Sequence, residues 1–336
     1  MHIIHPDERQ AAAIVQAMHA VASAEGEVEL LPVERDSIAA IQRHLLHRET
    51  LLEPASLALP ADLADVLDDP VTRRETVRIL AMLPVLDKRL LPAKVRAVEA
   101  AAARLGVEDQ GLVILRQAVN GRIRRLAFGL MMRSVAHYWS PTGKARLRDW
   151  LDMLRIGMPE IPGLYAVLTD KSLLAKYRGL GERPAGTLGN GLFRFYQDRG
   201  FPMPGEPKSF PEGWSKHEAY HVISEYETSD QGEMLNAAFS AGNTEVLCMD
   251  LLLLTLLQFQ AGIQVMPGPC LTDALRPDAF FRAVARGMAT KVDLLAGWDM
   301  WAVVDLPLDE LRRRYDVPPL SAEERVWLIE SGALLA

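Results

Sequence analysis

Apolar residues recur at intervals of three and four along almost the whole chain, and this spacing limits the folds that the chain can adopt. Ile14, Met18 and Val21 would share one face of a helix, and apolar residues at positions 95, 98, 102 and 105 repeat the pattern before Gly106. Ala and Leu are abundant, whereas alternating β-branched runs are few. The sequence therefore predicts an all-α fold, and its 336 residues are enough for two domains.

The charge and the cysteine content exclude several classes of function. The chain has 37 Lys and Arg against 44 Asp and Glu, and its formal net charge of −7 argues against a general nucleic-acid binder. Cys248 and Cys270 are too few for a disulfide framework, a four-cysteine zinc site or an iron–sulfur cluster. Any metal site must therefore use His, Asp or Glu.

The distribution of apolar residues bears on where the protein resides. The N-terminus lacks the basic region and apolar stretch of a signal peptide. The most apolar run, residues 246–265, is interrupted by Asp250, Gln258 and Gln260, whereas a membrane span needs about 20 predominantly apolar residues. We therefore expect a buried helix here, in a cytoplasmic protein that has at most a peripheral contact with the inner face of the membrane.

The first hundred residues contain a weak internal repeat. Residues 17–28 form the end of a helix and an acidic turn before Pro32, and residues 81–90 follow a similar plan before Pro92. Each proline is expected to begin a second helix. This pattern, with Ala24-Glu25-Gly26-Glu27 at the turn, resembles the tellurite-resistance B-like family of all-helical domains and implies a first domain at residues 1–106. Glu25, Glu27 and Glu29 could bind a cation, but a solvated acidic turn is the favoured interpretation.

A basic stretch follows the first domain. Between residues 116 and 155 there are nine Lys or Arg and two Asp, a net charge of +7 inside an acidic chain. Its predicted helix, residues 121–139, mixes basic residues with Phe128, Tyr138, Trp139 and other apolar residues; the basic positions are Arg122, Arg124, Arg125 and Arg133. Such a helix can lie on an anionic membrane, or it can be a connector with solvated or paired charges. We assign residues 107–158 to basic connector helices.

The residues that indicate chemistry are His217 and His221, followed by Glu233. Two histidines four residues apart on a helix place both imidazoles on one face, close enough to share a cation. Residues 225–232 are typical of a turn, so an antiparallel helix beginning near Glu233 would bring its carboxylate back over the histidines. The spacing therefore predicts a metal site.

Two other interpretations of this segment stay open. Ser215-x-x-Glu218 and Asp230-x-x-Glu233 both match a capping box, in which the glutamate holds a helix end rather than a metal. His217-Glu218-x-x-His221 also matches the zinc-hydrolase motif, in which the glutamate is the general base.

Residues 159 to about 317 resemble the coenzyme-Q-four family of ubiquinone biosynthesis proteins. That family carries H-D-x-x-H followed by eleven residues and E; here these positions are His217, Glu218, His221 and Glu233. It also carries P-x-G-T-L-G before an aromatic stretch, here residues 184–189. A tryptophan-containing helix and P-L-x-E-L-R follow in the family, and here Trp298 and Trp301 precede residues 307–312. The resemblance places a second domain at residues 159–336.

The resemblance implies a set of properties. The domain is expected to be all-α and dimeric and to lie on the membrane that holds its substrate. It is expected to hold a divalent ion, usually zinc, at His217, Glu218, His221 and Glu233. The implied function is oxidative removal of the C1 carboxyl from a polyprenyl hydroxybenzoate, a lyase reaction, together with organisation of the other ubiquinone-biosynthesis enzymes. A non-catalytic prenyl-lipid-binding scaffold with a structural metal is the competing hypothesis.

Three further features qualify this expectation. Glu218 stands where the family has Asp, and Glu225 stands where it has Gly. The polyprenyl tail needs an apolar channel, and Val246 to Leu257 is a candidate for its wall. The sequence does not assign catalytic residues beyond the metal site itself.

Overall fold

The computed structural model describes residues 1–139, 145–147, 149–151, 153, 169–210 and 212–335. Within these residues the chain contains helices and isolated bridges but no β-strand, so the all-α prediction is confirmed. None of the described helices has the length and apolar character that crossing a membrane requires.

The chain divides into two compact units. Unit 1 is Met1–Gly129 with Ala237–Met288, and unit 2 is Leu130–Asn236 with Ala289–Ala336. These units differ from the predicted ranges 1–106, 107–158 and 159–336, because residues 237–288 pack with the N-terminal helices. The predicted boundary between residues 158 and 159 lies outside the described residues.

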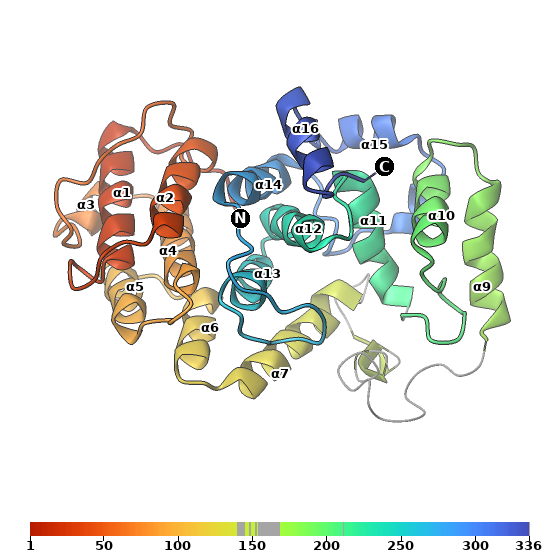
Figure 1. Ribbon diagram of the computed structural model, residues 1–336, viewed down its shortest axis with the longest axis horizontal. Helices are drawn as coiled ribbons and strands as arrows, with labels where there is room; N and C mark the ends of the chain where they lie inside the picture. Colours follow the sequence, from red (N-terminus) through yellow and green to blue (C-terminus); the bar gives the residue numbers. More distant parts are fainter. Residues whose placement is uncertain (140–144, 148, 152, 154–168, 211, 336) are drawn as a thin grey trace. The chain divides into compact units, whose positions relative to one another are not determined.

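Unit 1 is built from helices (Figure 1), and the apolar residues that they bury form its core. Its elements are α1 (Glu8–Ala22), α2 (Pro32–His44), α3 (Leu63–Val66), α4 (Pro70–Met82), the 3-10 helix η1 (Leu83–Leu86), α5 (Pro92–Leu105), α6 (Gln110–Val119), the first half of α7 (Ile123–Ser134), the end of α12 (Asp230–Asn243), α13 (Cys248–Thr255), the π-helix η5 (Leu256–Gln260) and α14 (Pro277–Ala289).

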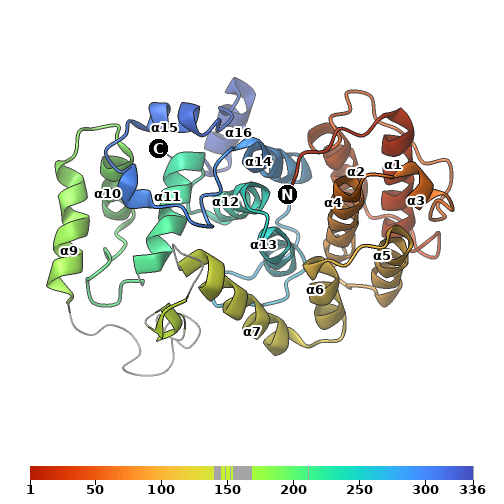
Figure 2. The ribbon, with the colours of Figure 1, turned by 180° about the vertical axis from the view of Figure 1, so that it is seen from behind.

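Unit 2 consists of shorter helices joined by irregular segments (Figures 1 and 2). Its elements are the second half of α7, the π-helix η2 (Val135–Trp139), α9 (Lys171–Arg178), η3 (Gly179–Glu182), α10 (Leu188–Arg199), η4 (Glu212–Trp214), α11 (Ser215–Ser224), the start of α12, η6 (Met300–Ala302), α15 (Leu308–Arg314) and α16 (Ala322–Glu330).

Local signals define the helix ends that the sequence predicted in unit 1. Pro32 and Pro92 are the first residues of α2 and α5, where a missing N–H costs nothing. Gly106 ends α5 with φ of 66°, a left-handed conformation that glycine adopts without strain. Asp7 and Gln10 form a reciprocal capping box at the start of α1.

The two halves of the repeat meet in a buried ion pair. Glu34 and Lys94 are the third residues of α2 and α5, the helices that follow the two prolines, and both side chains are fully buried. The Lys94 ammonium donates to the carboxylates of Glu34 and, at 3.1 Å, of Asp87. Burial opposes ionisation of Asp87, but hydrogen bonds from Arg89 and Lys94 lower its pKa to about 2.

The expected buried helix in the apolar run of residues 246–265 is present over part of it, as α13 (Cys248–Thr255) and η5 (Leu256–Gln260), whereas residues 262–265 are not helical. Its helix α13 packs against α4 and α6, and η5 packs against η1. The Gln260 side chain donates to the Leu86 carbonyl at 3.2 Å, which ties this segment to the repeat. A membrane span is therefore not needed to explain its composition, because the helix lies in the core of unit 1.

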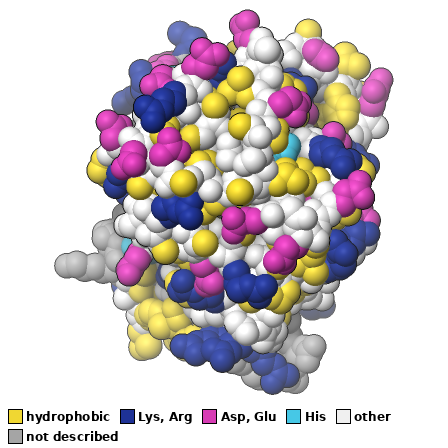
Figure 3. Space-filling model, turned by 90° about the vertical axis from the view of Figure 1, so that its left-hand side faces the viewer, with side chains coloured by type: hydrophobic (Ala, Val, Ile, Leu, Met, Phe, Trp, Pro, Cys, Tyr) yellow, Lys and Arg dark blue, Asp and Glu magenta, His cyan; other side chains and the backbone are white. Residues whose placement is uncertain are grey.

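The surface of unit 1 mixes charges of both signs. Figure 3 shows acidic and basic side chains interspersed over the face that carries the N-terminal helices. The acidic turn follows this rule: Glu29 pairs with Arg35 at 3.3 Å, and Glu25 accepts a hydrogen bond from the Leu59 N–H. Within the described residues these glutamates belong to no group of convergent metal ligands, so the solvated-turn interpretation holds.

The buried ion pair predicts the cost of removing its only lysine. Replacing Lys94 by Met would leave the Glu34 and Asp87 carboxylates buried without their shared cation, and this should lower the free energy of unfolding by about 3–5 kcal/mol. Urea denaturation measures the change. Lys88→Met is the matched control, because the half-exposed Lys88 pairs with Asp273 at the surface and should cost less than about 1 kcal/mol. Equal losses in the two variants would contradict the prediction.

Candidate metal centre

Helix α11 brings the two predicted histidines together. His217 and His221 lie one turn apart, and their Nε2 atoms are 3.2 Å from each other. His221 is fully buried, whereas about a quarter of the His217 side chain is exposed. One imidazole is therefore enclosed by the protein and the other faces an opening.

Glu233 closes the group from the next helix. Its carboxylate oxygens lie 3.4 Å from the His217 Nε2 and 3.5 Å from the His221 Nε2. The return of the chain needs a glycine, because a Cβ on Gly232 would stand 1.9 Å from the Glu227 carbonyl oxygen. The predicted helix–turn–helix is thus present, with α12 starting at Asp230 (Figures 1 and 2).

Glu218 is the fourth predicted ligand. His217, Glu218 and His221 each place a ligand atom within 4.8 Å of the others, the one such group in the part of the chain that the structure describes. Burial, with a smaller contribution from the nearby Glu233, raises the pKa of Glu218 to about 7 against the opposing effect of His217. The Glu218 carboxylate therefore reaches the histidine pair.

A backbone carbonyl fixes the tautomer of His221. The Nδ1 atom lies 2.9 Å from the Tyr226 carbonyl oxygen, which can only accept, so Nδ1 carries the proton. In the neutral ring the Nε2 lone pair then points toward His217 and Glu233. This is the outer-shell arrangement that orients histidine ligands in metal sites.

The turn that carries Tyr226 is itself held in place. Glu227 forms a two-point ion pair with Arg199 at the end of α10. Its N–H donates to the Ala333 carbonyl, and the Leu335 N–H donates to the Glu225 carbonyl. The C-terminal residues therefore help to position the imidazole of His221.

The geometry of the group fits a divalent cation. Zinc–ligand bonds of 2.0–2.1 Å in a tetrahedron place neighbouring ligand atoms about 3.3 Å apart, close to the 3.2–3.5 Å separations here. Burial alone would raise the pKa of Glu233, but the two adjacent histidines, in their protonated form, hold that pKa well below its usual range. An anionic carboxylate and two imidazoles thus converge on one point, which favours a bound cation.

The capping-box interpretation of these glutamates is wrong. The N-cap residue of α11 is Trp214, without a side-chain cap, and the Ser215 hydroxyl donates to the Glu212 carbonyl instead. At the start of α12, the Ser229 hydroxyl accepts from the Gly232 N–H. Glu218 and Glu233 are therefore available to a metal.

The other two motifs of the resemblance meet beside this helix. The Leu308 N–H donates to the Gly186 carbonyl, and the Leu188 N–H donates to the Leu306 carbonyl, so residues 184–189 pair with the segment before α15. The Arg312 side chain then donates to the carbonyls of Val222 and Ile223, at 2.9 and 3.1 Å, in the last turn of α11. The three motifs form one connected structure.

Comparisons with known proteins do not add a family assignment. No protein-family model, no curated protein and no solved structure matches this chain. The resemblances drawn from the motifs therefore remain hypotheses.

The other residues singled out in the sequence are not part of the group of metal ligands. Val246 to Leu257 lies in unit 1, where all but Val246, Leu251 and Leu254 are buried and pack in the core. The predicted tryptophan helix is a single 3-10 turn that includes Trp301, while Trp298 donates to the Tyr315 hydroxyl. Arg122, which directly precedes α7, and Arg124 and Arg125 on α7 are exposed.

Several residues of the site carried no recognisable signal in the sequence. Phe195 stacks on His221 with ring centres 5.5 Å apart, and Trp214 lies 5.2 Å from His217. Tyr226 acts through its backbone carbonyl, which no side-chain pattern could indicate. Arg312 stands in a quoted motif, but its contact with α11 depends on a pairing between segments more than 100 residues apart.

Glu225 occupies a strained backbone position at the end of α11. It is the C-cap residue of α11 with φ of 67°, the left-handed conformation that favours glycine. Its carboxylate pairs with Arg325 at 2.8 Å, and that contact partly offsets the strain of about 1–2 kcal/mol.

The left-handed Glu225 leads to a prediction about two substitutions. Glu225→Gly should have at least the stability of the original chain, because the relief of strain exceeds the loss of one partly exposed ion pair. Glu225→Ala loses the pair and keeps the strain, so it should be less stable than Glu225→Gly by about 1 kcal/mol. Urea denaturation compares them, and an Ala variant as stable as the Gly variant would show that the strain is absent.

Proposed function

We propose that this protein is a metal-dependent ubiquinone-biosynthesis protein that removes the C1 carboxyl from a polyprenyl hydroxybenzoate. His217, Glu218, His221 and Glu233 would hold the divalent ion, with zinc as the first candidate. The observation that carries the proposal is the junction of three motifs: residues 184–189 pair with the P-L-D-E-L-R segment, whose Arg312 caps the helix that bears the histidines. Chance matches would not be expected to join in this way.

The chemistry of the group suits an aromatic acid. When bound, a divalent ion supplies positive charge that can hold the ring carboxylate or phenolate and stabilise charge that develops on the ring as the carboxyl leaves. Tyr226 keeps the His221 ring in one orientation, while Phe195 stacks on His221 and Trp214 lies beside His217. Imidazole and carboxylate accept no electrons, so replacing the carboxyl by a hydroxyl, a two-electron oxidation, needs an external oxidant. We propose dioxygen for this role: the acid, dioxygen and water would give the phenol, carbon dioxide and hydrogen peroxide.

A scaffold function is the second candidate, and the ligand count favours it. Four protein ligands would complete a tetrahedral zinc shell, whereas catalytic zinc sites keep one position open. In that case the ion stabilises α11 and α12, and the protein binds a prenylated lipid and organises other ubiquinone-biosynthesis enzymes, with dimerisation as part of that role. Turnover by the purified protein separates the two candidates.

Measuring metal content and turnover on the same samples tests the proposal. The purified chain should contain about one equivalent of divalent metal, and His221→Ala should weaken metal binding by at least about 100-fold. His44→Ala is the control, because His44 pairs with Asp278 in unit 1. With dioxygen present, the metal-loaded chain should decarboxylate a prenylated hydroxybenzoate, and His221→Ala should not.

Each other outcome has a definite meaning. If the His221→Ala variant retains the metal, these residues do not form the metal site. A metal-loaded chain that binds the prenylated acid without converting it supports the scaffold instead. Chelator-sensitive cleavage of peptides or esters that is lost in Glu218→Gln would identify a zinc hydrolase and overturn both candidates.

A membrane contact through α7 is part of the same proposal, because the substrate is a lipid. Arg122, Arg124 and Arg125 are exposed and form no ion pair with the described residues. Phe128 and Met132 on the same helix are 58% and 38% exposed. Arg133 is half-buried and less accessible, and the side chains of Tyr138 and Trp139 lie outside the part of the chain that the structure describes. Exposed arginines beside apolar side chains are typical of a helix that lies on an anionic bilayer.

The α7 contact predicts salt-sensitive binding to vesicles. Changing Arg122, Arg124 and Arg125 together to Gln should weaken binding to phosphatidylserine-containing vesicles about 100-fold, since each basic residue near the surface contributes about 1 kcal/mol. A triple Gln variant at the exposed Arg96, Arg194 and Arg313 has the same net charge and should retain binding. Vesicle sedimentation at low salt measures both, and equal losses would argue for attraction by net charge alone.

A further inference from the structure

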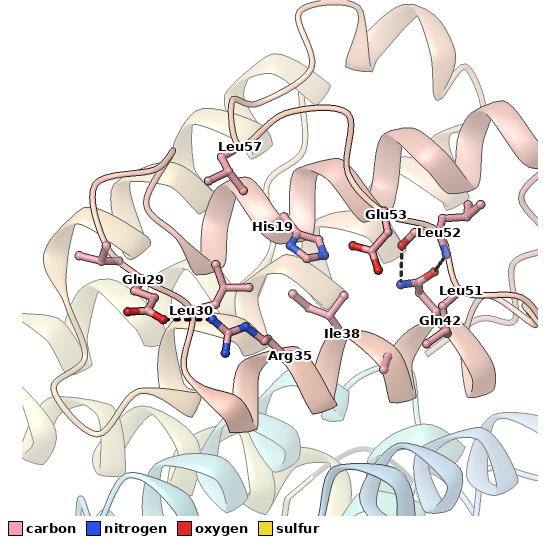
Figure 4. Close-up of a pocket in the computed structure, with 12 residues that line it drawn as sticks. His19, Glu29, Leu30, Arg35, Ile38, Gln42, Leu51, Leu52, Glu53 and Leu57 are labelled. Carbon is pink, nitrogen blue, oxygen red and sulfur yellow. Dashed lines mark hydrogen bonds and ion pairs between the residues drawn. The ribbon is translucent and has the colours of Figure 1, made fainter.

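Unit 1 contains a cavity that the metal centre does not use. It has a volume of about 370 Å³ and lies between α1, α2 and the loop of residues 51–57 (Figure 4). Its apolar walls include Leu30, Ile38 and Leu52, with the partly exposed Leu51 and Leu57 at the rim. A cavity of this size can enclose a small organic molecule.

Two polar side chains face each other across it, the half-buried His19 and the exposed Glu53. His19 comes from the last turn of α1, Glu53 comes from the loop, and Figure 4 shows the carboxylate directed toward the imidazole. The Glu53 carboxylate makes no hydrogen bond or ion pair with any described residue. Burial lowers the pKa of His19, against the opposing effect of Glu53, and so favours the neutral form of the ring.

The charged side chains that line the cavity have a net charge of −1 when His19 is neutral. Arg35 is paired with Glu29 at 3.3 Å, and these two groups cancel. The remaining charged group is Glu53, so the lining carries −1 with His19 neutral. An unpaired carboxylate among leucine and isoleucine side chains is complementary to a cation that has an apolar body.

Hydrogen bonds from α1 and α2 hold the loop that carries Glu53. The buried Gln42 side chain accepts from the Leu52 N–H at 2.7 Å and donates to the Leu52 carbonyl at 3.2 Å. Gln16 on α1 donates to the Ser56 hydroxyl and to the Ala58 carbonyl, at 3.0 and 2.9 Å. The position of Glu53 next to Leu52 is therefore fixed by the fold, which gives the cavity a preformed wall.

We propose that this cavity binds a small organic cation whose ammonium group lies between Glu53 and His19 and whose apolar body packs on Leu30, Ile38 and Leu57. The Glu53 carboxylate accepts hydrogen bonds from the ammonium, and the unprotonated nitrogen of His19 accepts another. The site is independent of the proposed metal chemistry in unit 2.

Three probes of matched shape test the proposal by calorimetry on the full chain. They are 4-phenylbutylamine, 4-phenylbutanol and 4-phenylbutyrate at pH 7. The amine should bind with one-to-one stoichiometry and at least ten times more tightly than the alcohol or the acid. Binding that is equal for amine and alcohol, or tightest for the acid, overturns the proposal, as does the absence of binding by the amine at millimolar concentration.

Variants locate the ammonium group. Glu53→Gln should lower the affinity for the amine at least tenfold and leave the affinity for the alcohol unchanged. Glu49→Gln removes the same charge from an exposed position outside the cavity lining and should change neither. Leu57→Ser should weaken amine and alcohol alike. If Glu53→Gln retains full affinity for the amine, or Glu49→Gln loses as much, the carboxylate is not the anchor and the proposal fails.

Discussion

Burial of a short polar helix is the constraint on which unit 2 depends. α11 carries Lys216, Glu218, His221 and Ser224 in the interior, and each polar group taken from water needs a partner. The neighbouring segments supply several of these partners: the Tyr226 carbonyl for His221, the Asn236 amide oxygen for the Ser224 hydroxyl, and Arg312 for the last carbonyls of the helix. The Lys216 ammonium has no hydrogen-bond partner among the described residues. The turn, the α15 segment and the C-terminal residues are therefore arranged around α11, and the metal group is a consequence of that arrangement.

The cation that we propose completes this arrangement electrostatically. Two imidazoles and the carboxylate of Glu233 converge at 3.2–3.5 Å, with the buried Glu218 close by, and a shared positive ion is the simplest group that satisfies all of them. Because the same four ligands can either form a closed structural site or release one position to substrate, the coordination number decides between scaffold and enzyme. The oxidant is a separate requirement that neither imidazole nor carboxylate meets.

Unit 1 also pairs polar groups in its interior, here as a buried ion pair between two helices. Its two helix–turn–helix units resemble each other in sequence, yet Glu34 and Lys94 carry opposite charges at matching positions and pair in the core. Such a pair contributes little net stability compared with apolar packing, but it penalises any arrangement that separates the two helices. Side-chain amides also hold the loop over the cavity: Gln42 bonds both backbone polar groups of Leu52, and Gln16 donates to the Ser56 hydroxyl and the Ala58 carbonyl at the surface.

The sequence by itself determined the helical class, the helix starts at Pro32 and Pro92, the end at Gly106, and the pairing of His217 with His221. These features depend on contacts within about one turn of helix, so local spacing is enough to predict them. Only the tertiary structure decided that Glu218 and Glu233 are not helix caps, that residues 237–288 pack with the N-terminal helices, and that Val246 to Leu257 serves largely as core. It also decided the roles of the Tyr226 carbonyl, Arg312 and Glu53. Each of these depends on groups distant in sequence or on the backbone, and hydrophobic periodicity carries no information about which distant segment will satisfy a buried polar group.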